Sequence, residues 1–330
     1  MSNRCFTRPA LVLLLLSPAI GELLSSSAPP VEFFNPIRLM IFCALYGGGA
    51  ILVRELKLYW RKGWLAVFLL GLAYAIVEEG LMCKSFFDPK WPDIGLLGSY
   101  GRWGGVNWVW AELLSVGHSV YSIAIPILLM ELTFPNRRDE HWVSPRCAVV
   151  IAVIMALDVV LGYFGMSKYR PPMGPFLAFA ALAAGLVYAA KALDWPGATV
   201  TGEPQRPVAR PWKFWLVGLV GGFCFMLHSF SAPNNPEIPP LATVAVSVSI
   251  VALCGSILIR MSGNGQKWRD IHRFSAAAGA LGVFIFVALI AKVSKGRTDN
   301  PTGMAAVGVV TIAMLLWLRG EIMGRQDVGT

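Results

Sequence analysis

Apolar residues follow one another along this chain in long stretches, and the charged residues gather in the short segments between them. Each stretch approaches the ~20 residues that an α-helix needs to cross the hydrocarbon of a bilayer. None shows the two-residue alternation of a barrel strand, and backbone groups in lipid must be hydrogen-bonded, so each stretch is predicted to be a helix. The candidate spans, about ten by this length rule, are centred on Leu15, Leu45, Leu72, Val120, Met155, Leu182, Gly222, Ser249, Phe284 and Ile312.

The composition agrees with this pattern. Hydrophobic residues make up 56% of the 330 residues and charged residues 14%, and the mean hydropathy is +0.60. Such values are typical of polytopic membrane proteins and exclude soluble folds. The predicted fold class is therefore all-α, a membrane helix bundle of about ten transmembrane helices.

A single transmembrane domain is predicted for residues 1–330, with one linker-like segment. This segment, residues 194–212, is rich in Pro and is predicted to be cytoplasmic. Residues 1–193 then form the first six helices and contain the intramembrane carboxylates, whereas residues 213–330 form the last four and are dominated by Ala, Val, Gly and Leu.

The first span is less regular than the others. It contains Pro18 and Glu22. Basic residues precede the apolar run and serines follow it, an arrangement that is also typical of a signal peptide. We expect an uncleaved helix, because Pro29 directly follows the would-be cleavage residue Ala28 and disfavours cutting, and because a membrane helix tolerates a Pro kink.

Basic residues indicate the orientation of the bundle. If the N-terminus is cytoplasmic, the N-terminal tail, the even-numbered loops and the C-terminal tail hold most of the 28 Lys and Arg residues. Cytoplasmic loops carry such an excess, so both termini are predicted to be cytoplasmic. The net charge of +9 is dispersed over short loops at the membrane ends. It suits contact with membrane lipids and requires no nucleic acid partner.

The six cysteines lie in different segments, without a CxxC motif or a short-range pair. From this spacing we expect neither a disulfide framework nor a zinc site. P-loop, HExxH, GxSxG and dinucleotide-binding motifs do not occur in the sequence. The sequence therefore predicts no cofactor and no metal ion, and it excludes the enzyme classes that carry those motifs.

Small residues predict where helices approach closely. Gly218 and Gly222 form a GxxxG step in the seventh span, and Gly47 to Gly49 interrupt the second. Both motifs predict tight helix packing. A hinge is the alternative for the glycine triplet.

Two adjacent acidic residues, Glu78 and Glu79, interrupt the apolar third span. A carboxylate near the middle of a bilayer costs about 2.5 to 3.5 kcal/mol on insertion scales, and ionisable groups at that depth usually serve an ion, a proton or a substrate. Two adjacent carboxyls add their costs and repel each other when both ionise. The alternative for each acidic residue of a span is a protonated, hydrogen-bonded strut.

Helix rise places further polar groups near the same depth. At ~1.5 Å per residue, Glu78 and Glu79 lie roughly 20 Å above the cytoplasmic end of their span, in the outer half of the membrane. Four other ionisable residues of the spans fall in the outer half or near mid-depth, and they are Glu112, His118, Asp158 and His228. This shared depth indicates a common polar site.

Helical faces refine this hypothesis. Asn107, His118 and Ser122 lie on one stripe of the fourth span. Because Pro126 cannot donate to the carbonyl of Ser122, a kink is expected to leave that acceptor free, one turn from His118. Glu78 and Glu79 point about 100° apart on an α-helix, so one of them is expected to face His118 and the other a neighbouring helix.

Residues 86–110 pack four tryptophans among glycines on the predicted outer side of the membrane, above the carboxylates. An aromatic belt at the interface explains this composition. The alternative is a lid over the site, in which Trp103 stacks on a substrate and Arg102 contacts an anionic group.

These observations define the candidate site. The catalytic candidates are Glu78, Glu79 and His118. The candidates for substrate contact are Glu112, Asn107, Ser122, Asp158, His228, Arg102 and Trp103.

The run VEEGLMCKSFFDP, followed about 35 residues later by LLSVGHSVYSI, resembles a group of uncharacterised bacterial multi-pass proteins with an EEGL and FxP signature. This resemblance implies a bacterial plasma membrane and carries no activity.

The same region is distantly similar to the CAAX-protease-like (CPBP) family of glutamate intramembrane proteases. The pattern of that family is EExxxR, then FxxxH, then HxxxN or HxxxD. Glu78 and Glu79 match the first pair, with Cys83 at the Arg position. His118 matches the second element, with Leu114 in place of Phe.

For the third element, His228 has Ala232 where Asn or Asp is expected, and the base nearest to the missing Arg is Lys84. The resemblance implies that a Glu activates water toward a membrane-embedded substrate and that the histidines assist.

Three functions are consistent with these residues. The first is an intramembrane hydrolase in which Glu79 or Glu78 is the general base and His118 stabilises the oxyanion or donates a proton. The second is a proton- or cation-coupled secondary transporter of a small solute, with the carboxylates as ion sites. The third is a membrane scaffold without chemistry. The sequence does not indicate the substrate or the oligomeric state.

Overall fold

The computed structural model describes residues 5–193, 207–235, 237–263, 267–293 and 299–327. Its α-helices are α1 (Arg8–Pro18), α2 (Pro30–Phe33), α3 (Pro36–Phe42), α4 (Gly48–Tyr59), α5 (Trp64–Ala75), α6 (Trp108–Gly117), α7 (Ile125–Thr133), α8 (Pro145–Gly165), α9 (Met173–Ala192), α10 (Pro211–Ser231), α11 (Pro240–Met261), α12 (Asp270–Ile290) and α13 (Met304–Asp327).

Short elements join or extend these helices. The π-helical turns are η1 (Ala19–Leu24), η2 (Cys43–Gly47), η3 (Ile76–Met82) and η5 (His118–Ala124). The 3-10 turns are η4 (Gly95–Gly98), η6 (Pro135–Arg137), η7 (Ala232–Asn234) and η8 (Ala291–Val293). The strands are β1 (Arg102–Trp103) and β2 (Val106–Asn107), which pair antiparallel.

Nine helices in the described part of the chain are long and apolar enough to cross a membrane. They coincide with nine of the ten predicted spans. Two of them, Pro36–Tyr59 and Trp108–Thr133, consist of two α-helical pieces joined through a π-turn, and Trp64–Met82 ends in one. The remaining predicted span, centred on Leu15, is the shorter helix formed by α1 and η1. The predicted all-α polytopic bundle is confirmed.

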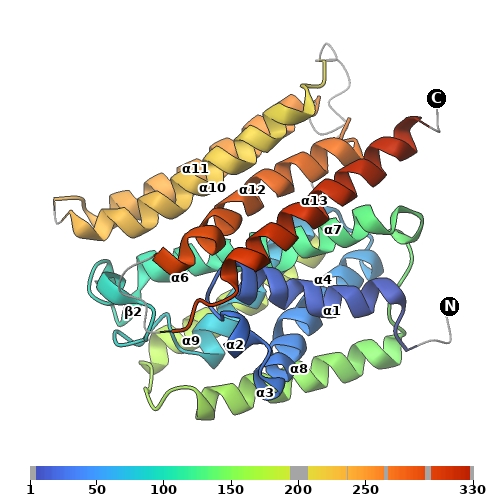
Figure 1. The fold of residues 1–330 in the computed structure, drawn as a ribbon. Helices are drawn as coiled ribbons and strands as arrows, with labels where there is room; N and C mark the ends of the chain where they lie inside the picture. Colours follow the sequence, from blue (N-terminus) through green and yellow to red (C-terminus); the bar gives the residue numbers. More distant parts are fainter. Residues whose placement is uncertain (1–4, 194–206, 236, 264–266, 294–298, 328–330) are drawn as a thin grey trace.

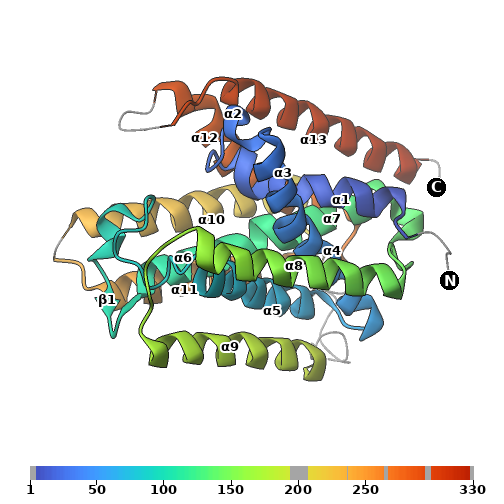
Figure 2. The same cartoon turned by 90° about the horizontal axis from the view of Figure 1, so that it is seen from below.

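The helices lie side by side, with α1 beginning and α13 ending at the same end of the bundle (Figure 1). α9 covers one side of the bundle and α12 and α13 the other, as the view from below shows (Figure 2). Of the nine candidate spans, Trp64–Met82 and Trp108–Thr133 have the largest share of buried residues in their most apolar stretch, 61% and 67%. The acidic pair and His118 are therefore carried by the two central spans.

Glycines permit the close contacts between helices. A Cβ atom added at Gly218 would lie 2.2 Å from the carbonyl oxygen of Ala276, and one added at Gly47 would lie 2.2 Å from that of Leu14. Both distances are shorter than any van der Waals contact. The predicted close packing at these glycine motifs is confirmed.

One prediction about the cysteines is wrong. Cys5 and Cys147 form a disulfide with a Cα–Cα distance of 5.7 Å, across a sequence separation of 142 residues. The backbone of Thr7 bonds to the carbonyl of Trp142, which brings the N-terminal segment beside the start of α8. The two cysteines meet only because the folded chain brings these segments together. Their spacing in the sequence therefore could not predict the disulfide. In a reducing compartment the same two residues would be a thiol pair.

The predicted linker, residues 194–212, is described only in its last part. Residues 194–206 lie outside the described residues. Ala209 donates its backbone N–H to the carbonyl of Met261, which fixes the approach to α10.

Candidate functional site

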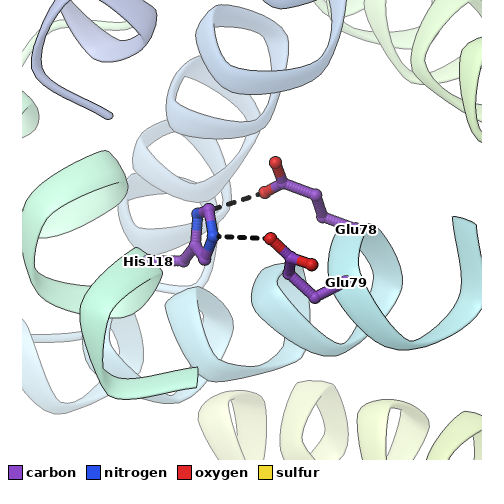
Figure 3. Close-up of side chains that lie close together, drawn as sticks. All are labelled: Glu78, Glu79 and His118. Atoms are coloured by element: carbon purple, nitrogen blue, oxygen red, sulfur yellow. Dashed lines mark hydrogen bonds and ion pairs between the residues drawn. The ribbon is translucent and has the colours of Figure 1, made fainter. Parts of the chain in front are cut away.

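Glu78, Glu79 and His118 converge between the two central spans (Figure 3). The Nδ1 atom of His118 lies 3.2 Å from Glu78 Oε2, and its Nε2 atom lies 3.2 Å from Glu79 Oε1. Glu78 is 3% exposed and His118 9% exposed. One buried imidazole therefore contacts two carboxylates through its two ring nitrogens.

The expectation that only one of the two glutamates would face His118 is wrong. Both belong to the π-helical turn η3, and a π-turn is wider than an α-turn. The estimate of their divergence assumed α-helical geometry. In addition, the two nitrogens of an imidazole point in different directions, so one ring can accept two partners.

All four π-helical turns of the described residues carry a polar residue of this region. Glu22 lies on η1, Tyr46 on η2, the acidic pair on η3 and His118 on η5. π-helical turns are rare and occur frequently at functional sites. Their coincidence in four different spans marks this region as the candidate functional site.

Pro126 explains one of these turns. It is the second residue of α7, which follows η5, and it has no N–H to donate, so a carbonyl in the preceding turn lacks its helical partner. The carbonyl of Ser122 instead accepts a hydrogen bond of 2.6 Å from Ser17 Oγ of α1. The predicted release of this acceptor is confirmed, and the released group ties the first span to the site.

Hydroxyl groups hold the cluster in place. Ser122 Oγ lies 3.2 Å from His118 Nδ1. Ser85 donates to the second oxygen of Glu79, and it accepts a hydrogen bond of 3.2 Å from the Trp110 indole. Glu79 is thereby fixed at both oxygens, by His118 and by Ser85.

Sequence reasoning missed part of this site. The Tyr46 hydroxyl donates to the carboxylate of Glu22, and the Tyr46 ring lies 5.8 Å from the His118 ring. The Tyr74 ring lies 6.3 Å from the same ring. Glu22 was visible as a carboxylate in an apolar run, which is the signal that could have found it.

The other residues of the predicted site lie in two groups. Ser122 belongs to the cluster, whereas Asn107 and Arg102 organise the loop above it. Asn107 is fully buried and donates to the carbonyls of Ser85 and Asp88, both at 3.1 Å. Arg102 donates to Asn107 and to the carbonyl of Phe87. These bonds position Ser85, and through it Glu79.

Four predicted residues are not brought to the cluster. The carboxylate oxygens of Glu112 and one oxygen of Asp158 have no hydrogen-bond partner among the described residues. His228 Nε2 lies 3.3 Å from the carbonyl of Thr243. Trp103 is 77% exposed. Glu112, Asp158 and His228 were grouped with the site by depth, and similar depth in the membrane does not imply a shared face.

Comparison with known proteins identifies the family of the chain. The model of the "Uncharacterized membrane protein family" matches residues 11–324. The chain belongs to this family. No curated protein and no solved structure matches the chain. The family match agrees with the apolar helices and covers every residue of the Glu/His cluster, from Glu22 to Ser122.

Cys83 and Lys84 follow the acidic pair closely in the sequence, but neither provides a reactive group beside it. Burial, and then the carboxylates of Glu79 and Glu78, raise the pKa of Cys83 well above its usual value, so its thiol stays neutral and is a poor nucleophile. Lys84 donates to the carbonyls of Tyr163 and Ser167, both at 2.6 Å. It does not replace an arginine beside the glutamates.

The arrangement provides acid, base and cation-binding groups within one small volume. Glu78, Glu79 and His118 each offer one possible metal-ligand atom, and these three atoms lie within 4.8 Å of one another. Carboxylate and imidazole groups at hydrogen-bond distance can exchange a proton with a water molecule or a substrate. The same three groups are also a set of metal ligands.

Proposed function

We propose that this protein is an intramembrane hydrolase whose base is a glutamate, acting on a membrane-embedded substrate in a bacterial plasma membrane. The convergence of Glu78 and Glu79 on the two nitrogens of His118 carries this proposal. Acid–base catalysis requires its groups within hydrogen-bond reach of one another, or one water apart. These three residues meet that requirement inside two membrane spans.

Glu79 is the better general base of the pair. Its side chain is 13% exposed, against 4% for that of Glu78, so water reaches it more easily. Ser85 occupies its second oxygen. Its other oxygen, Oε1, faces His118 Nε2 at 3.2 Å, and this is the atom that would accept a proton from a water molecule beside the pair. Glu78 orients His118 from the other ring nitrogen.

Hydrolysis would proceed in two steps. The Glu79 carboxylate takes a proton from water, and the water oxygen forms a bond to the carbonyl carbon of the substrate. An N–H of His118 donates to the oxyanion that develops on the carbonyl oxygen. The carbon then loses its bond to the leaving group, which receives the proton from Glu79. One water is consumed and both side chains return to their starting state.

The similarity to the CAAX-protease-like family supports the same roles for Glu79 and His118. It does not extend to the third element, because His228 contacts Thr243 and lies outside the cluster. Cys83 and Lys84 also do not supply the arginine of that pattern. The proposal therefore depends on the observed geometry of Glu78, Glu79 and His118.

Glu22 favours a second candidate, a cation-coupled transporter. It adds a third carboxylate, linked to the His118 ring through Tyr46. Transporters bind coupling ions near interrupted helices, and two spans of this chain are interrupted by π-turns that carry Tyr46 and His118, while two other helices end in π-turns at the cluster. Uptake of a solute that needs an ion gradient and is lost in Glu22→Gln would favour this candidate.

Complementation of cells that lack the gene tests the hydrolase. We expect a membrane peptide or lipid to accumulate in these cells and to return to normal with the wild-type gene. Glu79→Gln and His118→Ala should fail to restore it at wild-type protein abundance. Glu112→Gln and Asp158→Asn, which change carboxyls outside the cluster, should restore it. Full restoration by Glu79→Gln would contradict the proposal, and so would loss of function in all four variants alike.

A further inference from the structure

The Glu/His cluster contains more acidic groups than basic ones. In the described part of the chain, His118 is the ionic partner of both Glu78 and Glu79. Glu22 adds a third carboxyl through Tyr46. The nearest lysine in sequence, Lys84, points to the carbonyls of Tyr163 and Ser167. Buried charges in proteins are paired or coordinate metals, and here one imidazole contacts two carboxyls, with a third bonded to the neighbouring Tyr46.

Two buried polar atoms beside the imidazole also lack a hydrogen bond. Glu78 Oε2 and the hydroxyl of Tyr74 have no hydrogen-bond partner among the described residues, although the two side chains belong to residues only 3% and 4% exposed. Glu78 Oε2 lies 3.2 Å from His118 Nδ1 as an ion pair, but that nitrogen is also 3.2 Å from Ser122 Oγ. A carboxylate oxygen has two lone pairs, so beside its contact with His118 this oxygen can also accept a cation.

From these observations we propose that Glu78, Glu79 and His118 bind a divalent metal ion. The inference rests on the site of the proposed hydrolase and adds its cofactor: with the ion bound, Glu79 and His118 would be its ligands, and the ion would activate the water and stabilise the oxyanion in their place. A divalent ion would offset the excess of carboxylates and would satisfy Glu78 Oε2. This proposal replaces the expectation that no metal is involved, which was drawn from the absence of a sequence motif. The ligands come from two spans, so no short motif could show them.

The donor set indicates the kind of ion. Two carboxylate oxygens and one imidazole nitrogen suit zinc or manganese, whereas the absence of a thiolate among them disfavours a soft metal. Three protein ligands that leave one position free are typical of catalytic zinc sites. Ligands of one zinc ion lie roughly 3.5 Å apart, since each bond is about 2.0–2.2 Å. The observed spacing, up to 4.8 Å, is wider because Glu78 and Glu79 contact different nitrogens of the ring. One of the two carboxylates must therefore move toward the nitrogen that binds the ion.

Metal analysis of the purified protein tests the inference. The full chain is purified in detergent without chelators and its metal content is measured by mass spectrometry. We expect about one equivalent of zinc or manganese per chain, and a fall of about tenfold or more in Glu78→Gln, Glu79→Gln and His118→Ala. Glu112→Gln and Asp158→Asn are the matched controls and should keep the metal.

A second measurement covers the case in which metal is lost during purification or a variant folds poorly. Chelator-treated wild-type protein should unfold at a higher temperature when Zn²⁺ or Mn²⁺ is added, because an ion that binds the folded state stabilises it. The two control variants should show the same shift, and His118→Ala should show none. Equal shifts in all proteins, or no bound metal and no shift in the wild type, would overturn the inference.

The outcomes for the metal and for the hydrolase are separable. A protein that processes its substrate after complete chelation would refute the metal and leave the hydrolase standing. A protein that binds the metal at this site, but whose Glu79→Gln variant fully restores the cells, would refute the hydrolase and leave the metal standing.

Discussion

Glu79 and Glu112 are both acidic residues of central spans, but their surroundings differ. Glu79 contacts His118 through one oxygen and Ser85 through the other. Neither oxygen of Glu112 has a hydrogen-bond partner among the described residues. A carboxyl without partners is a net cost in a membrane span, whereas a carboxyl fixed on both sides is organised for a task. The presence of hydrogen-bond partners therefore distinguishes a residue of the candidate site from an isolated polar residue.

This difference predicts the effect of an apolar replacement at Glu112. Glu112→Leu should raise the free energy of unfolding by about 1 kcal/mol or more, because it removes a buried polar group without breaking a hydrogen bond. Thermal unfolding of the purified variant in detergent measures the change. A lower stability than wild type would show that Glu112 has a partner, such as a bound ligand or water.

The elements around the site are held at short distances by small residues. Gly47 of η2 lies against the backbone of Leu14 in α1, and Gly49 of α4 lies against the ring of Tyr74. η2 carries Tyr46, and η1, which continues α1, carries Glu22. The contact between these two spans thus determines whether Tyr46 reaches Glu22.

We predict that Gly47→Ala separates the first two spans. The new Cβ would lie 2.2 Å from the carbonyl oxygen of Leu14, a backbone atom that cannot move alone, so the stability should fall by about 1–3 kcal/mol. Gly185→Ala in α9 is the matched control, because nothing lies within 4 Å of its added Cβ. It should be neutral or stabilising by up to about 1 kcal/mol. Equal thermal stability of the two variants would contradict the observed packing.

The π-turns mark the limit of what the sequence could predict about the elements. Helical periodicity and hydropathy identified every long span, and Pro126 identified the released carbonyl of Ser122. The same periodicity placed only one of Glu78 and Glu79 toward His118, because it assumes an α-helix throughout. A widening of the helix over a few residues depends on tertiary contacts, such as that of Ser17 with Ser122.

For the whole molecule, the sequence predicted the class of fold and part of the site. It did not predict the contributions of Glu22 and Tyr46, which come from the first two spans, because single-span reasoning does not show which helices are neighbours. It also grouped Asp158 and His228 with the site by depth alone. Both cysteines of the Cys5–Cys147 pair were visible, but their contact depends on how α1 and α8 are arranged.

The central claim is that Glu79 and His118 act as one unit inside the membrane. A double-mutant cycle on the free energy of unfolding tests it most directly, with Glu79→Gln, His118→Ala and the combined variant, and with Glu112→Gln and His118→Ala as the control cycle. We predict that the first cycle departs from additivity by about 1 kcal/mol or more and that the control cycle is additive. If the first cycle is also additive within about 0.5 kcal/mol, the two side chains do not interact and the account is wrong.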